Sequence, residues 1–525
     1  MMQAAEALPA FRAGQGAYGQ SRQCFENHLV SFIDSSEAHT MTHSELEREL
    51  EKRGRELMRQ LLQDHLDTRS PGETAGPVVD SDSEQRNNIR NHDRSIKTVF
   101  GTLTIERAGY GQEGKNSLHP LDAELNIPKE LYSLELRKRV AQEAAKSSFD
   151  DTLEHILEVT GVKIPKRQAE ELAARAARDF DAFYDTRRID GSREETPGSL
   201  LVLTVDGKGV VMLERDLRET TRKAAQQSRH KKKSRLSQGE KKNSKRMATV
   251  ASIYTIEPHI RTPEDIALGT KEHVRDGPKP PRPENKRVWA SLKKEPEEVI
   301  EELFQEAFSR DPEQQKTWVA LVDGNKTQIK QLRKQAKKQN CNLHIILDIY
   351  HVSEYLWKAG KAFHPESGTK QEAWVGQRLL QVLRGKAGYV AGGIRRSATL
   401  QKLSSKARIP IDKCADYLLN NKAYLHYDRY LCLGLPVATG VIEGACKHLV
   451  KKRMEDTGAR WSLEGAEAVL KLRALLCSHD FDEYWEFHEK CEYKRNHESL
   501  YKNGIVPKTI SARHPRKNGR LNKIK

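Results

Sequence analysis

Three short apolar runs, each suited to a buried strand, constrain the fold of this chain more than any other feature. They lie at residues 200–205, 318–322 and 342–348, and are rich in β-branched, aromatic and aliphatic side chains. Helical periodicity precedes the second run, over 296–310, and follows it, over 327–339. Alternating strands and helices predict an open α/β sheet, in which functional groups gather near the strand ends.

Two aspartates directly follow the first two runs, and each is itself followed by a glycine. They are Asp206 and Asp323, and a third carboxylate, Glu443, lies on a basic helical segment further along the chain. Carboxylates at strand ends can converge in space, and a pair of divalent cations needs several such oxygen ligands. The three residues therefore predict a metal site. An Asp-Gly pair is also a strong hairpin signal, so residues 204–212 are equally consistent with a tight turn.

The charge of the chain favours a polyanionic partner. Lysine and arginine number 90 against 74 aspartates and glutamates, which gives a formal charge of +16 and favours nucleic acid. The densest basic run spans 222–246 and includes Lys231, Lys232 and Lys233. Such a run is either a solvated loop or, beside the first aspartate, a contact for a phosphate backbone.

Cysteine usage and apolar content indicate the cellular compartment. The seven cysteines are scattered without a Cys-x-x-Cys pair, which is typical of a reduced cytoplasmic protein and argues against a zinc finger or a disulfide scaffold. No stretch approaches the roughly 18 apolar residues of a membrane span, and residues 1–20 lack the features of a signal peptide. We expect a cytoplasmic protein with no membrane partner.

The first part of the chain predicts a long helix, a linker and a hairpin. Leucines recur at helical spacing over 45–66, which predicts an amphipathic helix for packing or self-association. Proline, glycine and acidic residues over 70–84 indicate a linker. Alternation of apolar and polar residues around Gly101, over 95–107, predicts a small β-hairpin.

Three helices are predicted next, over 134–146, 147–160 and from 166 to about 184. A glycine-containing turn precedes the third helix, which opens with Lys166 and Arg167. This order is compatible with a helix-turn-helix whose last helix enters the major groove of DNA. A helical hairpin with no role in DNA binding is equally consistent with it.

Four motifs, taken in order, resemble those of the DDE transposases of bacterial insertion sequences. They read LTVDG at 203–207, ALVDG at 320–324, LDIYHVSE at 347–354 and GVIEG at 440–444. The layout is most similar to the Kra-type insertion-sequence family, which is related to Mutator-like elements. KRM at 452–454 and GARWS at 458–462 strengthen the resemblance, which spans about 95–476.

The resemblance implies an RNase H-like catalytic core interrupted by an all-α insertion and preceded by a mostly helical DNA-binding region. It implies that Asp206, Asp323 and Glu443 bind two Mg²⁺ ions, with Mn²⁺ as a substitute. The metals would activate water or a DNA 3′-hydroxyl during strand cleavage and joining. The implied partners are double-stranded DNA with terminal inverted repeats, target DNA and, because two ends must be joined, further copies of the chain. Such a protein is expected at the nucleoid.

Asp348 and His351 match the D-x-x-H signature that follows the second catalytic aspartate in this family. If the strand passes into a helix there, both side chains share a face, and His351 could contact DNA phosphate or orient a metal ligand. A structural polar pair at the sheet edge is the other interpretation.

Several basic residues near Glu443 are candidate DNA contacts. Lys447 and Lys451 follow Glu443 at intervals of four and share its helical face, although ordinary salt-bridge spacing gives the same pattern. Trp461 could stack on an unpaired base, but a buried core tryptophan is the more frequent alternative. The candidates of this region are Lys447, Lys451, Arg453, Arg460 and Trp461.

One departure from the family concerns zinc. Relatives often carry Cys-x-x-Cys after a tyrosine in the N-terminal hairpin region, whereas residues 110–114 here read YGQEG. We therefore expect no structural zinc, and the N-terminal domain must rely on packing.

The sequence divides into six expected segments. These are an N-terminal helical or oligomerisation segment with a linker (1–94), a hairpin and helix-turn-helix-like DNA-binding domain (95–197), the first part of the core (198–351), the α-helical insertion (352–436), the final core helices with Glu443 (437–480) and a basic tail (481–525). Two alternatives to a transposase stay open: a non-enzymatic sequence-specific DNA-binding regulator, and an RNase H-like nuclease or resolvase without strand transfer. The three carboxylates disfavour the regulator.

Overall fold

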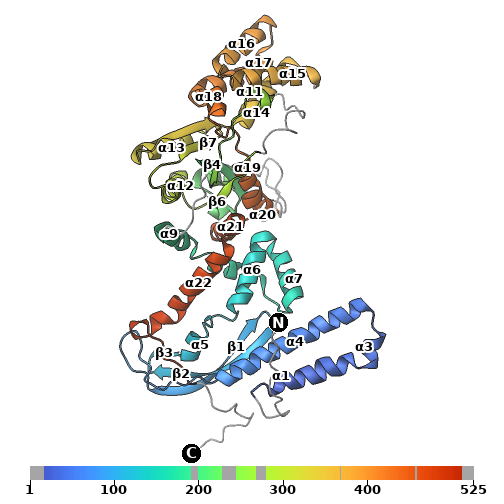
Figure 1. Cartoon of the computed structure of the whole chain (residues 1–525), viewed down its shortest axis with the longest axis vertical. Coiled ribbons are helices and arrows are strands. Elements are labelled where there is room, and N and C mark those ends of the chain that lie inside the picture. The colour runs from blue at the N-terminus through green and yellow to red at the C-terminus, as the bar shows by residue number, and fades with distance from the viewer. Residues whose placement is uncertain are drawn as a thin grey trace, which may run out of the picture. The chain divides into compact units, whose positions relative to one another are not determined.

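The structure, a computed structural model, describes residues 17–190, 199–227, 244–267, 280–366, 368–455 and 458–510 (Figure 1). The chain forms two units, a terminal unit of Met1–Asp179 with Asp482–Lys525 and a central unit of Phe180–Phe481. The segment predicted as a basic tail therefore begins with a helix, α22 (Phe481–Asn496). Its last part, 511–525, lies outside the described residues.

The terminal unit contains a three-stranded antiparallel sheet, in the order β1-β2-β3, and helices from both ends of the chain. Its elements are α1 (Gly19–Cys24), η1 (Phe25–Val30), α2 (Ser31–Ile33), α3 (Ser36–Thr40), α4 (His43–Arg69), β1 (Asn88–Thr98), β2 (Gly101–Gln112), β3 (Lys115–Leu118), α5 (Pro120–Glu124), α6 (Leu134–Lys146), α7 (Phe149–Thr160), α8 (Lys166–Ala176), α22, η6 (Glu498–Leu500) and η7 (Lys502–Gly504).

The predicted amphipathic helix is α4, and its leucines pack within the chain. Leu62 and Leu66 contact a core that includes Ile96 of β1 and Leu103 of β2. The predicted hairpin is confirmed as β1 and β2, which turn at Gly101, where φ is +132°. Packing, one of the two roles considered for this helix, is therefore the one that the structure shows.

The predicted linker at 70–84 is wrong, because part of this segment is buried. Val78 packs beside Tyr110 of β2 and Tyr501. Asp80 is 2% exposed and accepts hydrogen bonds from Arg86 Nε at 2.9 Å and Lys115 Nζ at 3.1 Å. The acidic residues that suggested a solvated linker therefore include a buried ion-pair partner.

The three predicted helices after the hairpin are confirmed, with one difference. Gly161, at φ +70°, ends α7, and α8 opens at Lys166. The third predicted helix breaks after Ala176, and the chain resumes as α9 (Phe180–Asp190) in the central unit. The expected boundary at residue 197 therefore lies near residue 180.

The central unit is built on a five-stranded mixed sheet in the order β6-β5-β4-β7-β8. β5 runs antiparallel to both of its neighbours, whereas β7 and β8 run parallel to β4. Its elements are α9, β4 (Leu200–Val211), η2 (Glu214–Asp216), α10 (Glu219–Gln227), β5 (Lys245–Ile256), α11 (Pro263–Ala267), β6 (Glu284–Ser291), α12 (Pro296–Arg310), β7 (Thr317–Val322), α13 (Lys326–Lys338), β8 (Leu343–Leu347), α14 (Ile349–Phe363), α15 (Thr369–Leu383), α16 (Ala387–Leu400), α17 (Ser405–Asn420), η4 (Lys422–Tyr424), α18 (Tyr427–Cys432), α19 (Gly440–Ala445), η5 (Cys446–Lys451), α20 (Lys452–Met454) and α21 (Leu463–Ser478).

β4 continues straight through Asp206 and Gly207, so the tight turn considered for residues 204–212 is excluded. Asp206 pairs with Val250 of β5, and the pairing extends to Val211 opposite Lys245. The antiparallel partner of β4 is therefore β5. The side chains of β4 from Leu200 to Val205 are buried, as the apolar run predicted.

Helices cover the sheet in layers (Figure 1). α12 and α13 pack against β4, β5, β7 and β8, while α19, η5 and α21 pack against β4, β5 and β6. The sheet is thus held between helices, which explains why the buried stretches of its central strands, such as Leu200 to Val205 of β4, are largely apolar. The α/β class predicted from the sequence is confirmed.

The segment predicted to be an all-α insertion is helical, as expected. α14 begins at Ile349, directly after β8, and helices continue through α18. α14 packs on α15 and α17, and α16 packs on α17, so the helices form a subdomain with its own apolar core. In the described part of the chain, no helix has the length and apolar character needed to cross a membrane.

Candidate metal centre

Asp206 and Asp323 lie side by side at one edge of the central sheet. β4 and β7 are parallel, with Thr204 opposite Leu321, so continuing the register by two residues brings Asp206 opposite Asp323. Neighbouring strands are about 4.8 Å apart. The convergence predicted for these two carboxylates therefore follows from the observed strand register.

Asp206 is held by contacts on both of its oxygens. Oδ1 accepts a hydrogen bond from the Gly207 amide at 2.6 Å, and Oδ2 accepts one from the thiol of Cys446 at 3.2 Å. Cys446 is buried three residues after Glu443, so the helix that carries the glutamate also contacts the first aspartate. Sequence reasoning missed this cysteine, although its position one turn after Glu443 was a usable signal.

Asp323 lies in a partly buried position beyond the end of β7. Its Oδ1 accepts a hydrogen bond from the Asn325 amide at 2.8 Å, and its main-chain carbonyl accepts one from the Tyr417 hydroxyl at 3.0 Å. Burial raises the pKa of its carboxyl, and the negative charge of Asp206 raises it further. The second effect is the electrostatic consequence of a neighbouring negative charge, which disfavours ionisation of Asp323.

Asp348 is completely buried at the N-terminus of α14 and fixes its surroundings. Its Oδ1 accepts hydrogen bonds from the amides of Tyr350 at 3.3 Å and Thr439 at 3.0 Å, while Oδ2 contacts His351 Nδ1 at 2.9 Å. The hydrogen bond to Asp348 raises the pKa of His351. The D-x-x-H motif thus forms the pair that the sequence predicted, with the strand passing into a helix there.

Glu443 projects from α19 toward this pair. One ligand atom each of Asp348, His351 and Glu443 lies within 4.8 Å of the others. Partial loss of solvent around the carboxyl raises the pKa of Glu443, although the residue as a whole is exposed, and the charges of Asp348 and Asp206 raise it further. Among the sequence-predicted carboxylates, only Glu443 groups closely with the D-x-x-H pair. Asp206 and Asp323 lie outside that close group but near enough to act on it electrostatically, since the charge of Asp206 affects Glu443 and that of His351 affects Asp323.

The donor set suits a metal cation. Within the described ranges, no lysine or arginine forms an ion pair with Asp206, Asp323 or Glu443. In the part of the chain that the structure describes, the carboxylates of the site therefore repel one another without a paired arginine or lysine to offset that repulsion. The imidazole of His351 is already hydrogen-bonded to Asp348. Carboxylate oxygens are the preferred ligands of hard divalent cations.

The helix that carries Glu443 has an irregular turn. α19 passes into a π-helical turn, η5, before α20. Arg473 of α21 donates hydrogen bonds to the carbonyls of His448 and of Leu449, the latter at 2.6 Å, and so satisfies acceptors in this turn. π-helical turns often occur at functional sites. The prediction that Glu443, Lys447 and Lys451 share one helical face assumed a regular α-helix, so the π-helical turn changes their alignment. Lys447 and Lys451 are both exposed.

Two of the predicted DNA contacts in this region are buried. Arg453 is 2% exposed, and its guanidinium lies over the ring of Trp461 at 4.8 Å. Trp461 is 5% exposed, and its Nε1 donates a hydrogen bond to the carbonyl of Met454 at 3.3 Å. Core packing, the alternative left open for the tryptophan, is what the structure shows, so neither side chain presents itself to DNA. Arg460 is exposed.

The remaining predicted DNA contacts lie elsewhere. Lys166 and Arg167 are exposed in the first turn of α8, where they pair with Asp150 at 2.7 Å and Glu171 at 3.3 Å. These surface ion pairs contribute little to stability, so a phosphate can replace the carboxylates. Lys231, Lys232 and Lys233 lie outside the described residues.

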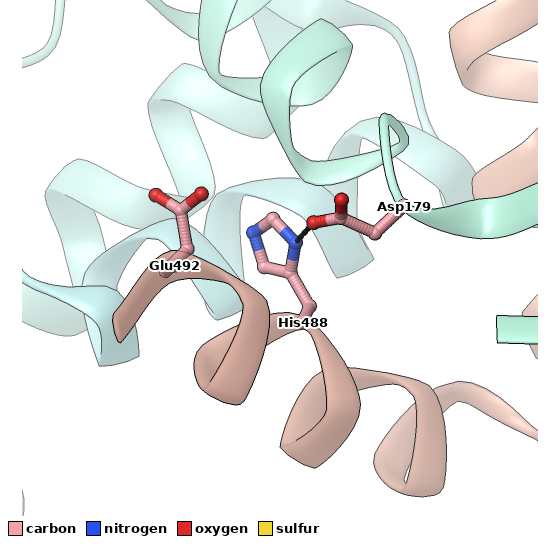
Figure 2. Close-up of side chains that lie close together, drawn as sticks. All are labelled: Asp179, His488 and Glu492. Carbon is pink, nitrogen blue, oxygen red and sulfur yellow. Dashed lines mark hydrogen bonds and ion pairs between the residues drawn. The ribbon is translucent and has the colours of Figure 1, made fainter. Parts of the chain in front are cut away.

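A second cluster of acidic and histidine side chains lies in the terminal unit, where Figure 2 shows the ring of His488 facing Asp179 with Glu492 on the same helix. Asp179, His488 and Glu492 are buried together, with His488 Nδ1 2.7 Å from Asp179 Oδ2. Three arginines, however, already pair with its carboxylates; they are Arg137, Arg178 and Arg495. A cation here would have to displace guanidinium groups, so this cluster is a structural one. The spacing of His488 and Glu492 by four residues on α22 was the signal in the sequence.

No protein-family model and no curated protein matches the chain. The chemistry of the metal centre must therefore be inferred from its own residues.

Proposed function

We propose that this protein is a DNA transposase of the DDE type, which cleaves and joins DNA strands at the ends of an insertion sequence. One observation carries the proposal: Asp206, Asp323 and Glu443, far apart in the sequence, converge with Asp348 and His351 at one sheet edge without a balancing lysine or arginine among the described residues. Perturbed carboxylates gathered at strand ends are a functional-site signature.

The topology supports an RNase H-like core. The sheet places its first strand, β4, between an antiparallel β5–β6 pair and two parallel strands, β7 and β8. An all-α subdomain stands between β8 and the helix of Glu443, as the resemblance to Kra-type transposases implied. A fold of this kind also serves nucleases, so the topology by itself does not select a reaction.

Mg²⁺, or Mn²⁺ in its place, fits the donor set, and when bound it activates water or a DNA 3′-hydroxyl and stabilises the leaving oxygen. The protein's own contribution is placement. Asp206 and Asp323 offer carboxylates from neighbouring strands, and Glu443 offers a third from α19. Asp348 orients His351 through the bond to Nδ1, which leaves Nε2 free to face a ligand or a phosphate.

The proposed partners are double-stranded DNA bearing terminal inverted repeats and a target DNA. The formal charge of +16 and the exposed Lys447, Lys451 and Arg460 beside the site suit a phosphate backbone. Two ends must be brought together before joining, so the active form is a homo-oligomer on DNA, in the nucleoid of the cytoplasm.

The test is cleavage of DNA carrying the element's ends, with purified protein and Mg²⁺. Asp206→Asn, Asp323→Asn and Glu443→Gln should each abolish cleavage while DNA binding persists. Asp416→Asn is the matched control, because this exposed carboxylate on α17 pairs with the guanidinium of Arg395 at 2.6 Å and belongs to no part of the candidate site. Full activity of any one of the first three variants removes that residue from the site.

The products decide between related functions. Joined products establish a transposase, whereas cleavage without joining establishes a nuclease or resolvase. Binding that never leads to strand scission, in any divalent metal, establishes a DNA-binding regulator.

A further inference from the structure

Two tyrosines of the α-helical subdomain reach the strand ends that carry the metal centre. The hydroxyl of Tyr417, on α17, donates to the main-chain carbonyl of Asp323 at 3.0 Å. The hydroxyl of Tyr427, on α18, donates to the main-chain carbonyl of Leu347, the residue before Asp348, at 2.7 Å. The two bonds link helices of the insertion to residues 94 and 80 positions away in sequence.

Tyr417 is itself held in place by close packing. Its ring stacks on Tyr355 of α14, with centroids 4.0 Å apart and planes 13° from parallel. Gly324 lies directly against it: a Cβ atom there would come within 3.2 Å of the Tyr417 ring and hydroxyl, and the residue has a φ of +96°. Glycine after Asp323 therefore lets the tyrosine approach the main chain of the aspartate.

The segment that leads to Glu443 is tied to the same strand end. The Ile349 amide donates to the carbonyl of Val437 at 3.0 Å, and the Thr439 amide donates to Asp348 Oδ1 at 3.0 Å. The Asp348 amide in turn donates to the carbonyl of Val322, the last residue of β7, at 2.8 Å. The chain segments bearing Asp323, Asp348 and Glu443 are thus joined through the insertion and the loop that leaves it.

We infer that Tyr417 and Tyr427 are positioning residues for the metal centre, which hold the main chain at Asp323 and Leu347 so that the carboxylates of β7, β8 and α19 keep the places needed to bind divalent cations. The inference rests on the proposed metal-dependent function and extends it to the insertion. The insertion then completes the centre instead of merely interrupting the core.

Tyrosine suits this task for a physical reason. A phenol hydroxyl carries its proton near neutral pH and can donate to a carbonyl oxygen, as both tyrosines do. Carbonyl oxygens fixed by a rigid donor allow less rotation of the following peptide, and residues that orient metal ligands typically account for about 10–100-fold in metal affinity or activity. Phenylalanine removes the donor and keeps the ring.

The experiment measures Mn²⁺ binding to the full chain without DNA, by electron paramagnetic resonance of the free ion. Tyr417→Phe and Tyr427→Phe should each weaken Mn²⁺ binding by about 10-fold or more, with unchanged circular dichroism. Tyr389→Phe is the matched control, because this tyrosine of α16 is 75% exposed within the same subdomain. In DNA cleavage, raising the Mn²⁺ concentration should restore the rate of the Tyr417 and Tyr427 variants toward that of the wild type.

The outcomes separate the two proposals. One outcome overturns the positioning role and leaves the proposed function standing. In it, the wild type binds Mn²⁺ and Asp323→Asn abolishes this binding, but both tyrosine variants bind Mn²⁺ as tightly as Tyr389→Phe does. A tyrosine variant that loses thermal stability but keeps its Mn²⁺ affinity likewise shows a purely structural role. If the wild type binds no Mn²⁺, the proposed function fails, and the positioning role fails with it.

Discussion

Replacing Glu443 by glutamine is expected to stabilise the metal-free protein. The ligand atoms of Glu443 and Asp348 lie within 4.8 Å of each other, and two unit charges at that distance repel by about 3.5 kcal/mol at an effective dielectric constant of about 20. Glu443 is exposed, so solvent and salt screen most of this energy, and His351, when protonated, offsets a further part. We expect a net gain of about 1 kcal/mol, or about 2 °C in Tm.

In the presence of a divalent metal, the wild type should instead be more stable than Glu443→Gln. A cation that binds only the folded protein, at a concentration about 100 times its Kd, raises the free energy of unfolding by about 2.7 kcal/mol. Glu443→Gln should gain less, because it has lost one ligand of the cation. Differential scanning calorimetry in EDTA and then in Mn²⁺ measures both effects, with Asp416→Asn as the control.

The pH dependence of stability checks whether the charge of Glu443 destabilises the metal-free protein. The folded protein raises the pKa of Glu443, so ionisation of this group costs stability above its unfolded pKa. The advantage of Glu443→Gln should therefore fade as the pH falls toward 4, where the carboxyl is protonated in both states. A variant that melts below the wild type in EDTA at neutral pH would refute the electrostatic reasoning.

Three other changes follow from the structure. Glu306→Gln leaves the buried guanidinium groups of Arg287 and Arg310 without their shared carboxylate and should lower the free energy of unfolding by about 3–5 kcal/mol, as measured in urea. The two arginines lower the pKa of Glu306 to about 2. The stability advantage of the wild type should therefore disappear as the pH falls from about 4.5 to 2. Trp461→Phe should reduce stability by about 1 kcal/mol through loss of its hydrogen bond and leave DNA affinity unchanged, as a fluorescence titration would show. Replacing Lys447 and Lys451 by glutamine should lower the slope of log affinity against log salt by roughly 1.8, if each contacts a phosphate.

The parts of the fold that sequence could predict are those set by local pattern. Buried runs such as 200–205 and 318–322 predicted their strands, and helical periodicity with the glycine-containing turn predicted α7 and its end, because side-chain periodicity and backbone conformation act over a few residues. The same reasoning could not choose between a strand and a turn at Asp206. That choice depends on β5, which pairs with β4 through and beyond the aspartate.

What sequence could not predict depends on partners distant along the chain. The hydroxyl of Tyr417 and the carbonyl of Asp323 are 94 residues apart, and no spacing rule joins them. The burial of Asp80 could not be predicted, because one of its partners, Lys115, lies 35 residues further along the chain, on β3. Trp461 and Arg453 could be read as DNA contacts because burial, which excludes that role, is a property of the folded protein.

The terminal unit contains a helix, α22, that is translated after the whole central unit. α22 supplies His488 and Glu492 to a buried network whose other members, Arg137 and Asp179, precede the central unit. Domains generally fold as they leave the ribosome, yet this unit lacks part of its interior until the central one has been synthesised. Nascent protein should therefore acquire the sheet bearing Asp206 before the unit bearing Lys166 is complete, and a messenger shortened after residue 481 should yield arginines buried without their counter-charges.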